Sequence, residues 1–158
     1  MSRDPRCEWL IEKNAKYHAL AAKVIEKRLA RMCKAHALSD TLCLGDYEFL
    51  SAVASAKTSD VSMAQIARQL GVNPSSATRR NRRLLECGLV SKTTDATDER
   101  RYQIALTDEG RAFWEEMDSA IFDITQVMYS TITDEEMKAV FSFTEKCIEN
   151  LQRIMDED

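Results

Sequence analysis

The feature that most constrains the fold is a pair of short helices whose ends are marked within residues 62–88. Ser62 lies three residues before Gln65, which is the spacing of a capping box, where the two side chains satisfy the first backbone amides of a helix. Gly71 follows the apolar positions of that helix and suits the left-handed residue that ends it. This first helix is therefore expected to be short, about two helical turns, and to end at Gly71.

A second helix start follows almost at once. Asn73 is a favoured N-cap residue and Pro74 a favoured first helical residue, while Gly88 suits the end of this helix. Two short helices joined by so tight a turn predict a helix-turn-helix motif.

The hydrophobic period changes after Gly88. Leu89 and Val90 form an apolar start, a polar centre follows, and apolar residues then alternate through Tyr102, Ile104 and Leu106. This pattern predicts a two-stranded hairpin with a charged tip. Thr107 is expected to cap the next helix.

Amphipathic helices flank this unit. Apolar residues recur at helical spacing over residues 8–36, 45–57 and 108–155, and Thr133 with Glu136 forms another capping box. Only four glycines and two prolines occur, so we predict a mainly α protein with a small β-hairpin. Residues 8–36 and 108–155 carry more apolar surface than one small helix-turn-helix unit can bury, which predicts a homodimer.

The second short helix concentrates positive charge, with four arginines in five positions. At about 100° per residue, Ala77, Asn81 and Leu84 fall on one side, which is expected to face the core. The opposite side carries Ser75, Arg79, Arg82 and Arg83, with Ser76 at its edge and with Thr78 and Arg80 beside the core face. Outward arginines can bond guanine O6 and N7, and short hydroxyls suit phosphates or base edges. The pattern predicts a helix that lies in a DNA major groove, although arginine-rich faces are also commonly just solvated surface.

The charge distribution supports a polyanionic partner. The whole chain has a formal net charge of −4, yet residues 61–101 hold eight Lys and Arg against four Asp and Glu. Residues 102–158 hold four against fourteen and are expected to face away from the partner.

The segment "VSMAQIARQLGVNPSSATRRNRRLLECGLVSKTTDATDERRYQIALTDEG" resembles the winged-helix core of the MarR family of transcriptional regulators. The most specific part is "DERRYQIALTDEG", which is similar to the family pattern D-x-R, alternating apolar residues and L-T-x-x-G. The resemblance implies a single domain over 1–158. Residues 45–107 would form the winged helix-turn-helix, and 8–36 and 108–155 the long N- and C-terminal dimerisation helices.

Carried over residue by residue, the resemblance makes Pro74 to Cys87 the recognition helix. Arg100 matches a wing-tip arginine that enters the minor groove, and Asp98 the acid that braces it. The expected DNA-binding residues are Ser75, Ser76, Thr78, Arg79, Arg82, Arg83, Lys92, Asp98, Arg100 and Arg101. Two positions depart from the family. Asn81 falls where an aliphatic residue is usual, and Lys92 where an arginine is common.

Other reactive residues allow weaker interpretations. Cys33, His36 and Cys43 lie close together but fit no strong zinc signature, so we predict no metal and no cofactor. Cys7 near the start of the first helix is similar in place to the thiol of peroxide-sensing relatives, which leaves a redox-sensing regulator open. No Ser/His/Asp set, glycine-rich phosphate loop or carboxylate pair stands out, so no catalytic residue is predicted.

The sequence thus predicts a cytoplasmic, homodimeric, ligand-responsive repressor that binds a palindromic operator in double-stranded DNA. A small-molecule effector is expected between the dimerisation helices and the winged helix. No apolar run approaches the roughly 20 residues that span a bilayer, so no membrane partner is expected. The alternative from another class is a winged helix used only for protein–protein contact.

Overall fold

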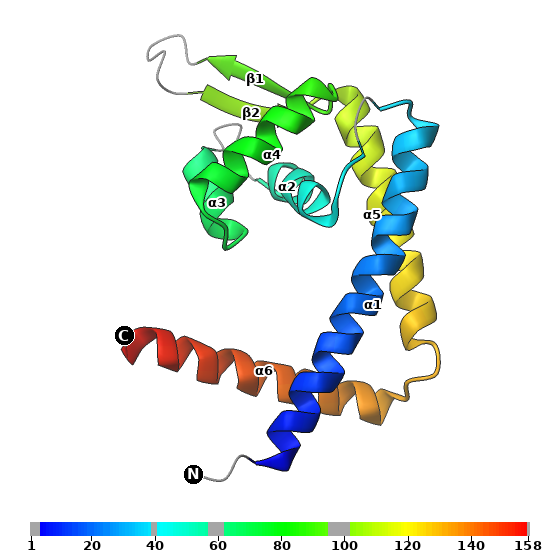
Figure 1. Cartoon of the computed structure of the whole chain (residues 1–158), viewed down its shortest axis with the longest axis vertical. Helices are drawn as coiled ribbons and strands as arrows, with labels where there is room; N and C mark the ends of the chain where they lie inside the picture. The colour runs from blue at the N-terminus through cyan, green and yellow to red at the C-terminus, as the bar shows by residue number, and fades with distance from the viewer. Residues whose placement is uncertain (1–3, 39–40, 57–61, 95–101, 158) are drawn as a thin grey trace. The chain divides into compact units, whose positions relative to one another are not determined.

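The computed structural model describes residues 4–38, 41–56, 62–94 and 102–157 (Figure 1). These form the helices α1 (Pro5–Ala35), α2 (Leu44–Ala54), α3 (Met63–Gln69), α4 (Pro74–Glu86), α5 (Asp108–Tyr129) and α6 (Asp134–Glu157), and the strands β1 (Val90–Thr94) and β2 (Tyr102–Leu106). The predicted mainly α class with a β-hairpin is confirmed. The chain divides into two compact units, residues 1–121 and 122–158, and each is described by itself.

The capping residues predicted for the helix-turn-helix motif make their bonds. The Gln65 amide donates to Ser62 Oγ at 3.3 Å, and the Ser62 amide donates to Gln65 Oε1 at 2.9 Å. At the start of α4, the Ser76 amide donates to Asn73 Oδ1 at 2.8 Å. Gly71 and Gly88 have φ of 62° and 72°, the left-handed conformation that ends a helix with little strain only at glycine.

β1 and β2 pair antiparallel, with Val90 opposite Leu106 and Lys92 opposite Ile104. The first unit is built around one hydrophobic core to which every element of residues 1–121 contributes. Its fully buried side chains include Leu29 of α1, Phe49 and Leu50 of α2, Ile66 of α3, Leu84 of α4, Leu89, Ile104 of β2, and Phe113 and Met117 of α5. This core joins the C-terminal end of α1 and the first turns of α5 to the helix-turn-helix motif.

Polar contacts also hold α5 against α2. The Trp114 indole donates to Ser51 Oγ at 3.0 Å, and the Tyr47 hydroxyl donates to Asp118 Oδ1 at 2.9 Å. Burial is the main cause that raises the pKa of Tyr47, so the hydroxyl keeps its proton and remains a donor at neutral pH.

A close backbone approach joins α5 to the end of α4. Thr107 Oγ1 accepts from the Gly110 amide at 2.9 Å and donates to the Gly88 carbonyl at 2.7 Å. A Cβ on Gly110 would lie 1.8 Å from the Leu89 carbonyl oxygen, so only glycine fits there. These contacts give Thr107 and Gly110 of the L-T-x-x-G segment a structural role.

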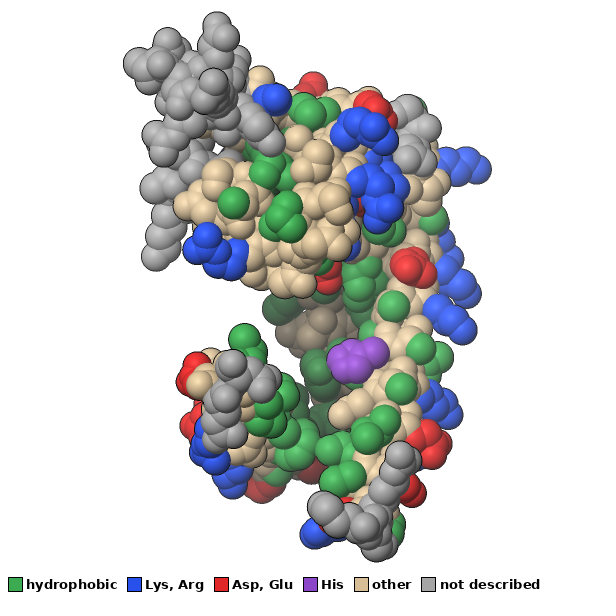
Figure 2. Space-filling model, turned by 60° about the vertical axis from the view of Figure 1, so that its left-hand side comes forward, with side chains coloured by type: hydrophobic (Ala, Val, Ile, Leu, Met, Phe, Trp, Pro, Cys, Tyr) green, Lys and Arg blue, Asp and Glu red, His purple; other side chains and the backbone are tan. Residues whose placement is uncertain are grey.

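The long helices expose much of their apolar surface. The first part of α1 exposes Trp9, Ile11, Tyr17, Leu20 and Val24, whereas its buried residues are Leu29, Met32 and Cys33 near its end. In the second unit, none of the described residues of α6 is buried, and its exposed large hydrophobic side chains are Val140, Phe141, Phe143, Ile148, Leu151, Ile154 and Met155. Figure 2 shows green hydrophobic side chains on the surface of both helices. Within the described ranges, no helix is both long and apolar enough to cross a bilayer.

Candidate nucleic-acid interface

The exposed surface of α4 carries two arginines and two hydroxyl side chains. Arg79 is exposed, and the Arg82 side chain keeps 76% of its area open to solvent. Arg82 Nε lies 3.8 Å from Glu86 Oε1, but both side chains are solvated, so this pair contributes little stability and leaves Arg82 available. The predicted outward position is therefore confirmed for Arg79 and Arg82.

The hydroxyl groups on this surface already make local bonds. Ser75 Oγ donates to Asn73 Oδ1 at 2.8 Å, and Thr78 Oγ1 donates to the Pro74 carbonyl at 2.9 Å. Each hydroxyl oxygen therefore presents lone pairs to solvent and suits a partner that donates, such as an exocyclic base amine. Ser76 is half-buried, and its amide is held by the Asn73 cap.

The expectation that Arg83 points away from the core is wrong for its guanidinium. Arg83 Nη1 donates to Asp46 Oδ2 at 2.9 Å, and the Asp46 side chain is fully buried at the start of α2. Rotation about the helix axis places the Cα of Arg83 near the edge of the outward side, but it does not say where a side chain this long will reach. The partner carboxylate lies 37 residues earlier in the chain.

Arg80 also leans onto α2. Arg80 Nη1 lies 3.9 Å from Glu48 Oε2, and its guanidinium lies over Gly45 so closely that a Cβ there would meet it. Neither this contact nor the Asp46 contact was predicted from the sequence, because burial of an acidic residue leaves no mark in a local pattern. The one available signal is that Asp46 occupies the third position of α2, where its Oδ2 accepts from the Cys43 amide at 2.9 Å.

Asn81 faces the core as predicted, with 7% of its area exposed. Its Oδ1 has no hydrogen-bond partner among the described residues, and neither has Asp46 Oδ1 or Arg80 Nη1. The contact between α2 and α4 includes the Arg83–Asp46 and Arg80–Glu48 ion pairs.

The hairpin contributes one described site residue. Lys92 is exposed on β1. Asp98, Arg100 and Arg101, predicted at the tip of the wing, lie outside the described residues.

The other candidate sites give no metal cluster within the part of the chain that the structure describes. Cys33 is buried, and its sulfur accepts from the Leu42 amide at 3.4 Å, while the His36 ring nitrogen Nε2 lies 2.8 Å from Glu116 Oε2. Cys43 is exposed at the start of α2, and Cys7 is exposed on α1. The redox interpretation of Cys7 stays a prediction.

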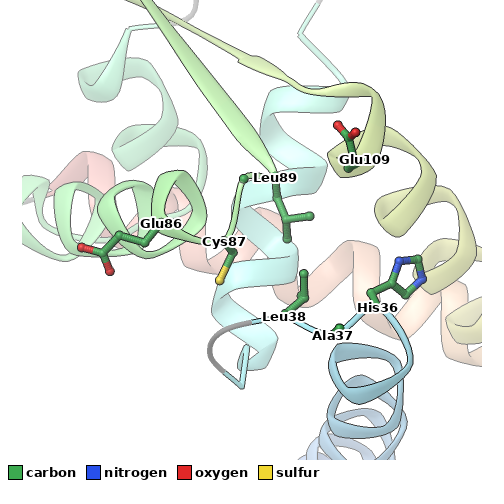
Figure 3. A pocket seen from close by; sticks show the side chains of 8 residues that line it. His36, Ala37, Leu38, Glu86, Cys87, Leu89 and Glu109 are labelled. Carbon is green, nitrogen blue, oxygen red and sulfur yellow. The ribbon is translucent and has the colours of Figure 1, made fainter.

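A pocket of about 580 Å³ lies where α1 ends, α4 ends and α5 begins (Figure 3). It is lined by His36, Ala37, Leu38, Glu86, Cys87, Gly88, Leu89 and Glu109. Its lining includes apolar side chains and the His36 ring, and Glu86 and Cys87 place it against the C-terminal end of α4, although the Glu86 carboxylate points away from the other labelled side chains in Figure 3.

Residues 44–101 match the model of the MarR family. Among curated proteins, the chain is similar to the HTH-type transcriptional regulator TcaR of Staphylococcus aureus (strain Newman), with 30% identity over 82 residues. That alignment covers 51% of this chain and 54% of the relative, so the chain spans about half the length of the curated relative it matches.

Solved structures support the fold over most of the chain. The DNA complex of S. aureus MepR is 17% identical with a TM-score of 0.68, covering 87% of this chain and 95% of MepR. PcaV of Streptomyces coelicolor, solved with its natural ligand, is 19% identical with a TM-score of 0.67, covering 94% of this chain and 97% of PcaV. At this level of identity, the similarity to the solved structures shows a common fold. The predicted resemblance to the MarR family is confirmed by the family model that matches residues 44–101.

Proposed function

We propose that this chain is a transcriptional regulator of the MarR type that binds double-stranded DNA through α4. The observation that carries the proposal is the exposed surface of α4, where Arg79 and Arg82 lie beside the Ser75 and Thr78 hydroxyls. This surface belongs to the second helix of a helix-turn-helix motif, the element that enters a major groove. The DNA-bound relative MepR has the same fold.

The proposed DNA contacts divide by their chemistry. Exposed Arg79 and the hydroxyls near the start of α4 would read base edges, while exposed Arg82 and Lys92 would add positive charge for the phosphate backbone. Arg100 and Arg101, with Asp98 bracing the wing tip, are proposed from the sequence resemblance alone.

A homodimer is the proposed binding form. A single chain leaves the apolar side of α6 and the first part of α1 exposed, and a second copy would cover such surfaces. Two copies of α4 related by a twofold axis require a palindromic operator.

Repression and its release by a small molecule complete the proposal. The pocket between the ends of α1 and α4 and the start of α5 is a suitable effector site, because its lining includes the last residues of the recognition helix. A ligand there would favour one orientation of α4 over another. The relative PcaV was solved with its natural ligand.

The rival function is a winged helix used only for protein contact. The two functions differ in the salt dependence of DNA affinity, because neutralised phosphates release counterions. Affinity for a random 25-base-pair duplex, measured by fluorescence anisotropy from 50 to 300 mM salt, should fall steeply if the protein binds DNA. No measurable affinity at 50 mM salt would favour the protein-contact rival.

Arg79→Ala is expected to reduce affinity for the operator by about 1–3 kcal/mol and to relax base preference at one position in each half-site. The reason is that Arg79 is exposed near the start of α4, and the N-terminal part of a recognition helix contacts base edges. Arg100→Ala should instead weaken binding to many sequences and lower the salt slope by roughly one unit per arginine lost. The measurement is affinity for the operator and for random duplexes at several salt concentrations. If both variants lose the same affinity on every duplex, the proposed division between base reading by Arg79 and sequence-independent binding by Arg100 is wrong.

Footprinting of the bound operator is expected to show two half-sites about 10 base pairs apart or slightly more, related by a twofold axis. This spacing follows from two recognition helices that enter successive major grooves on one face of the duplex. The operator can be obtained by selecting bound DNA from a random pool. A single asymmetric half-site would contradict the dimeric mode.

A further inference from the structure

The four arginines of α4 fall into two pairs with different environments. Arg79 and Arg82 extend from the exposed surface, whereas Arg80 and Arg83, one helical turn apart, reach the first turn of α2. Arg83 bonds a carboxylate that has no exposed surface, and Arg80 covers Gly45 beside Glu48. A basic helix does not need this second pair merely to attract DNA, so the pair calls for a separate explanation.

We infer that the ion pair between Arg83 and Asp46 is a positioning device, which sets the angle of the recognition helix on α2 instead of contacting DNA. The inference deepens the proposed function and rests on it. Asp46 Oδ2 joins two elements, since it accepts both from the Cys43 amide at the start of α2 and from Arg83 on α4. The carboxylate therefore ties the first turn of one helix to a particular rotation of the other.

Because Asp46 is buried, its contact with Arg83 restrains the rotation of α4. A carboxylate removed from water is costly unless it is paired, so any rotation of α4 that separates Arg83 from Asp46 leaves an unpaired buried charge. Ala77 and Leu84 pack α4 against the core on the same side, but apolar contacts alone tolerate small rotations. The ion pair adds the restraint that apolar packing lacks, and base readout by Arg79 depends on that restraint.

A positioning role and a direct phosphate contact for Arg83 predict different results for the variant Asp46→Asn. This variant keeps an oxygen to accept from the Cys43 amide but removes the charge that holds Arg83. If Arg83 only positions the helix, we expect the ratio of affinities for a selected duplex and a random duplex to fall by about tenfold, the size of coupling usual between contacting residues. If Arg83 contacts phosphate directly, freeing it should leave the ratio unchanged and raise both affinities. Using the ratio cancels the general effect of removing one negative charge.

The arginine variants complete the test. Arg83→Met should lower the same ratio without lowering the salt slope, and the double variant with Asp46→Asn should be no worse than the poorer single variant. Arg83→Lys should restore most of the ratio, because the bond uses one nitrogen and one oxygen, which a lysine can reproduce. The matched control is Arg82→Met, which removes one charge from the neighbouring exposed position and should weaken binding to both duplexes alike.

The inference can be separated from the proposed function by a measurement without DNA. Urea unfolding of the wild type, Asp46→Asn, Arg83→Met and their double variant should show coupling between positions 46 and 83. This measurement keeps the test open if Arg83→Met binds DNA poorly because it is less stable. If the wild-type protein binds neither duplex, the proposed function fails, while coupled unfolding still supports the ion pair as the link between α2 and α4. A lower salt slope for Arg83→Met with an unchanged ratio for Asp46→Asn would overturn the inference. Additive unfolding effects would overturn it as well.

Discussion

Replacing Ile148 and Leu151 by aspartate is expected to convert the protein from a dimer to a monomer and to abolish operator binding. Both side chains are exposed on α6, at 49% and 61% of their areas, within a helix of which no described residue is buried. If a second copy covers this side, each side chain buries only the half of its area that is still exposed, which is worth about 0.8–1.5 kcal/mol, and symmetry doubles the loss. The expected cost is therefore on the order of 3–6 kcal/mol for the dimer, a loss of more than about a hundredfold in the dimerisation constant.

Sedimentation equilibrium at micromolar concentration measures the change in mass, and anisotropy measures the loss of DNA binding. The control is Asn150→Asp with Arg153→Asp, since these two exposed residues have the same spacing on the opposite side of the helix. The control pair should remain a dimer. A double aspartate variant with the wild-type mass would show that this side of α6 is not the dimer contact.

Gly110→Ala is expected to destabilise the protein by about 3 kcal/mol or more, above the usual range for one added methyl group. The new Cβ would lie 1.8 Å from the Leu89 carbonyl oxygen and 2.7 Å from its carbonyl carbon. These are backbone atoms, and the Leu89 carbonyl also accepts from the Thr107 amide at 3.1 Å. The carbonyl cannot move without breaking that bond, so α5 must shift away from the end of the recognition helix.

Thermal and urea unfolding, followed by circular dichroism at equal protein concentrations, measure this loss. The matched control is Gly71→Ala, where no atom lies within 4 Å of the new Cβ. Gly71 has a φ of 62°, so the control reports only the strain of a left-handed alanine, roughly 1–2 kcal/mol. If the two alanine variants lose equal stability, the close approach at Gly110 is not a critical contact.

The features that could be predicted from the sequence depend on interactions between residues a few positions apart. The Ser62–Gln65 spacing predicted where α3 begins, and Asn73 followed by Pro74 predicted where α4 begins, because each cap acts within three residues of the chain. The alternation of apolar residues predicted the strands, because a pleated strand presents every second side chain to one face. The same rotation argument placed Asn81 in the core correctly, since short side chains stay near the direction of their Cβ atoms.

Patterns within the sequence were enough to predict the order of the helices and strands, the exposure of Arg79 and Arg82 on α4, and the resemblance to the MarR family, whose model matches residues 44–101. Tertiary structure alone decided that the Arg83 guanidinium is held by Asp46 and that Gly110 touches the Leu89 carbonyl. Helix caps and strand alternation depend on residues a few positions apart, so they can be recognised in the sequence. The Arg83–Asp46 ion pair joins residues 37 positions apart. An arginine side chain at the edge of a helix face is long enough to reach either solvent or a neighbouring helix. Only the packing of α4 on α2 selects among those partners.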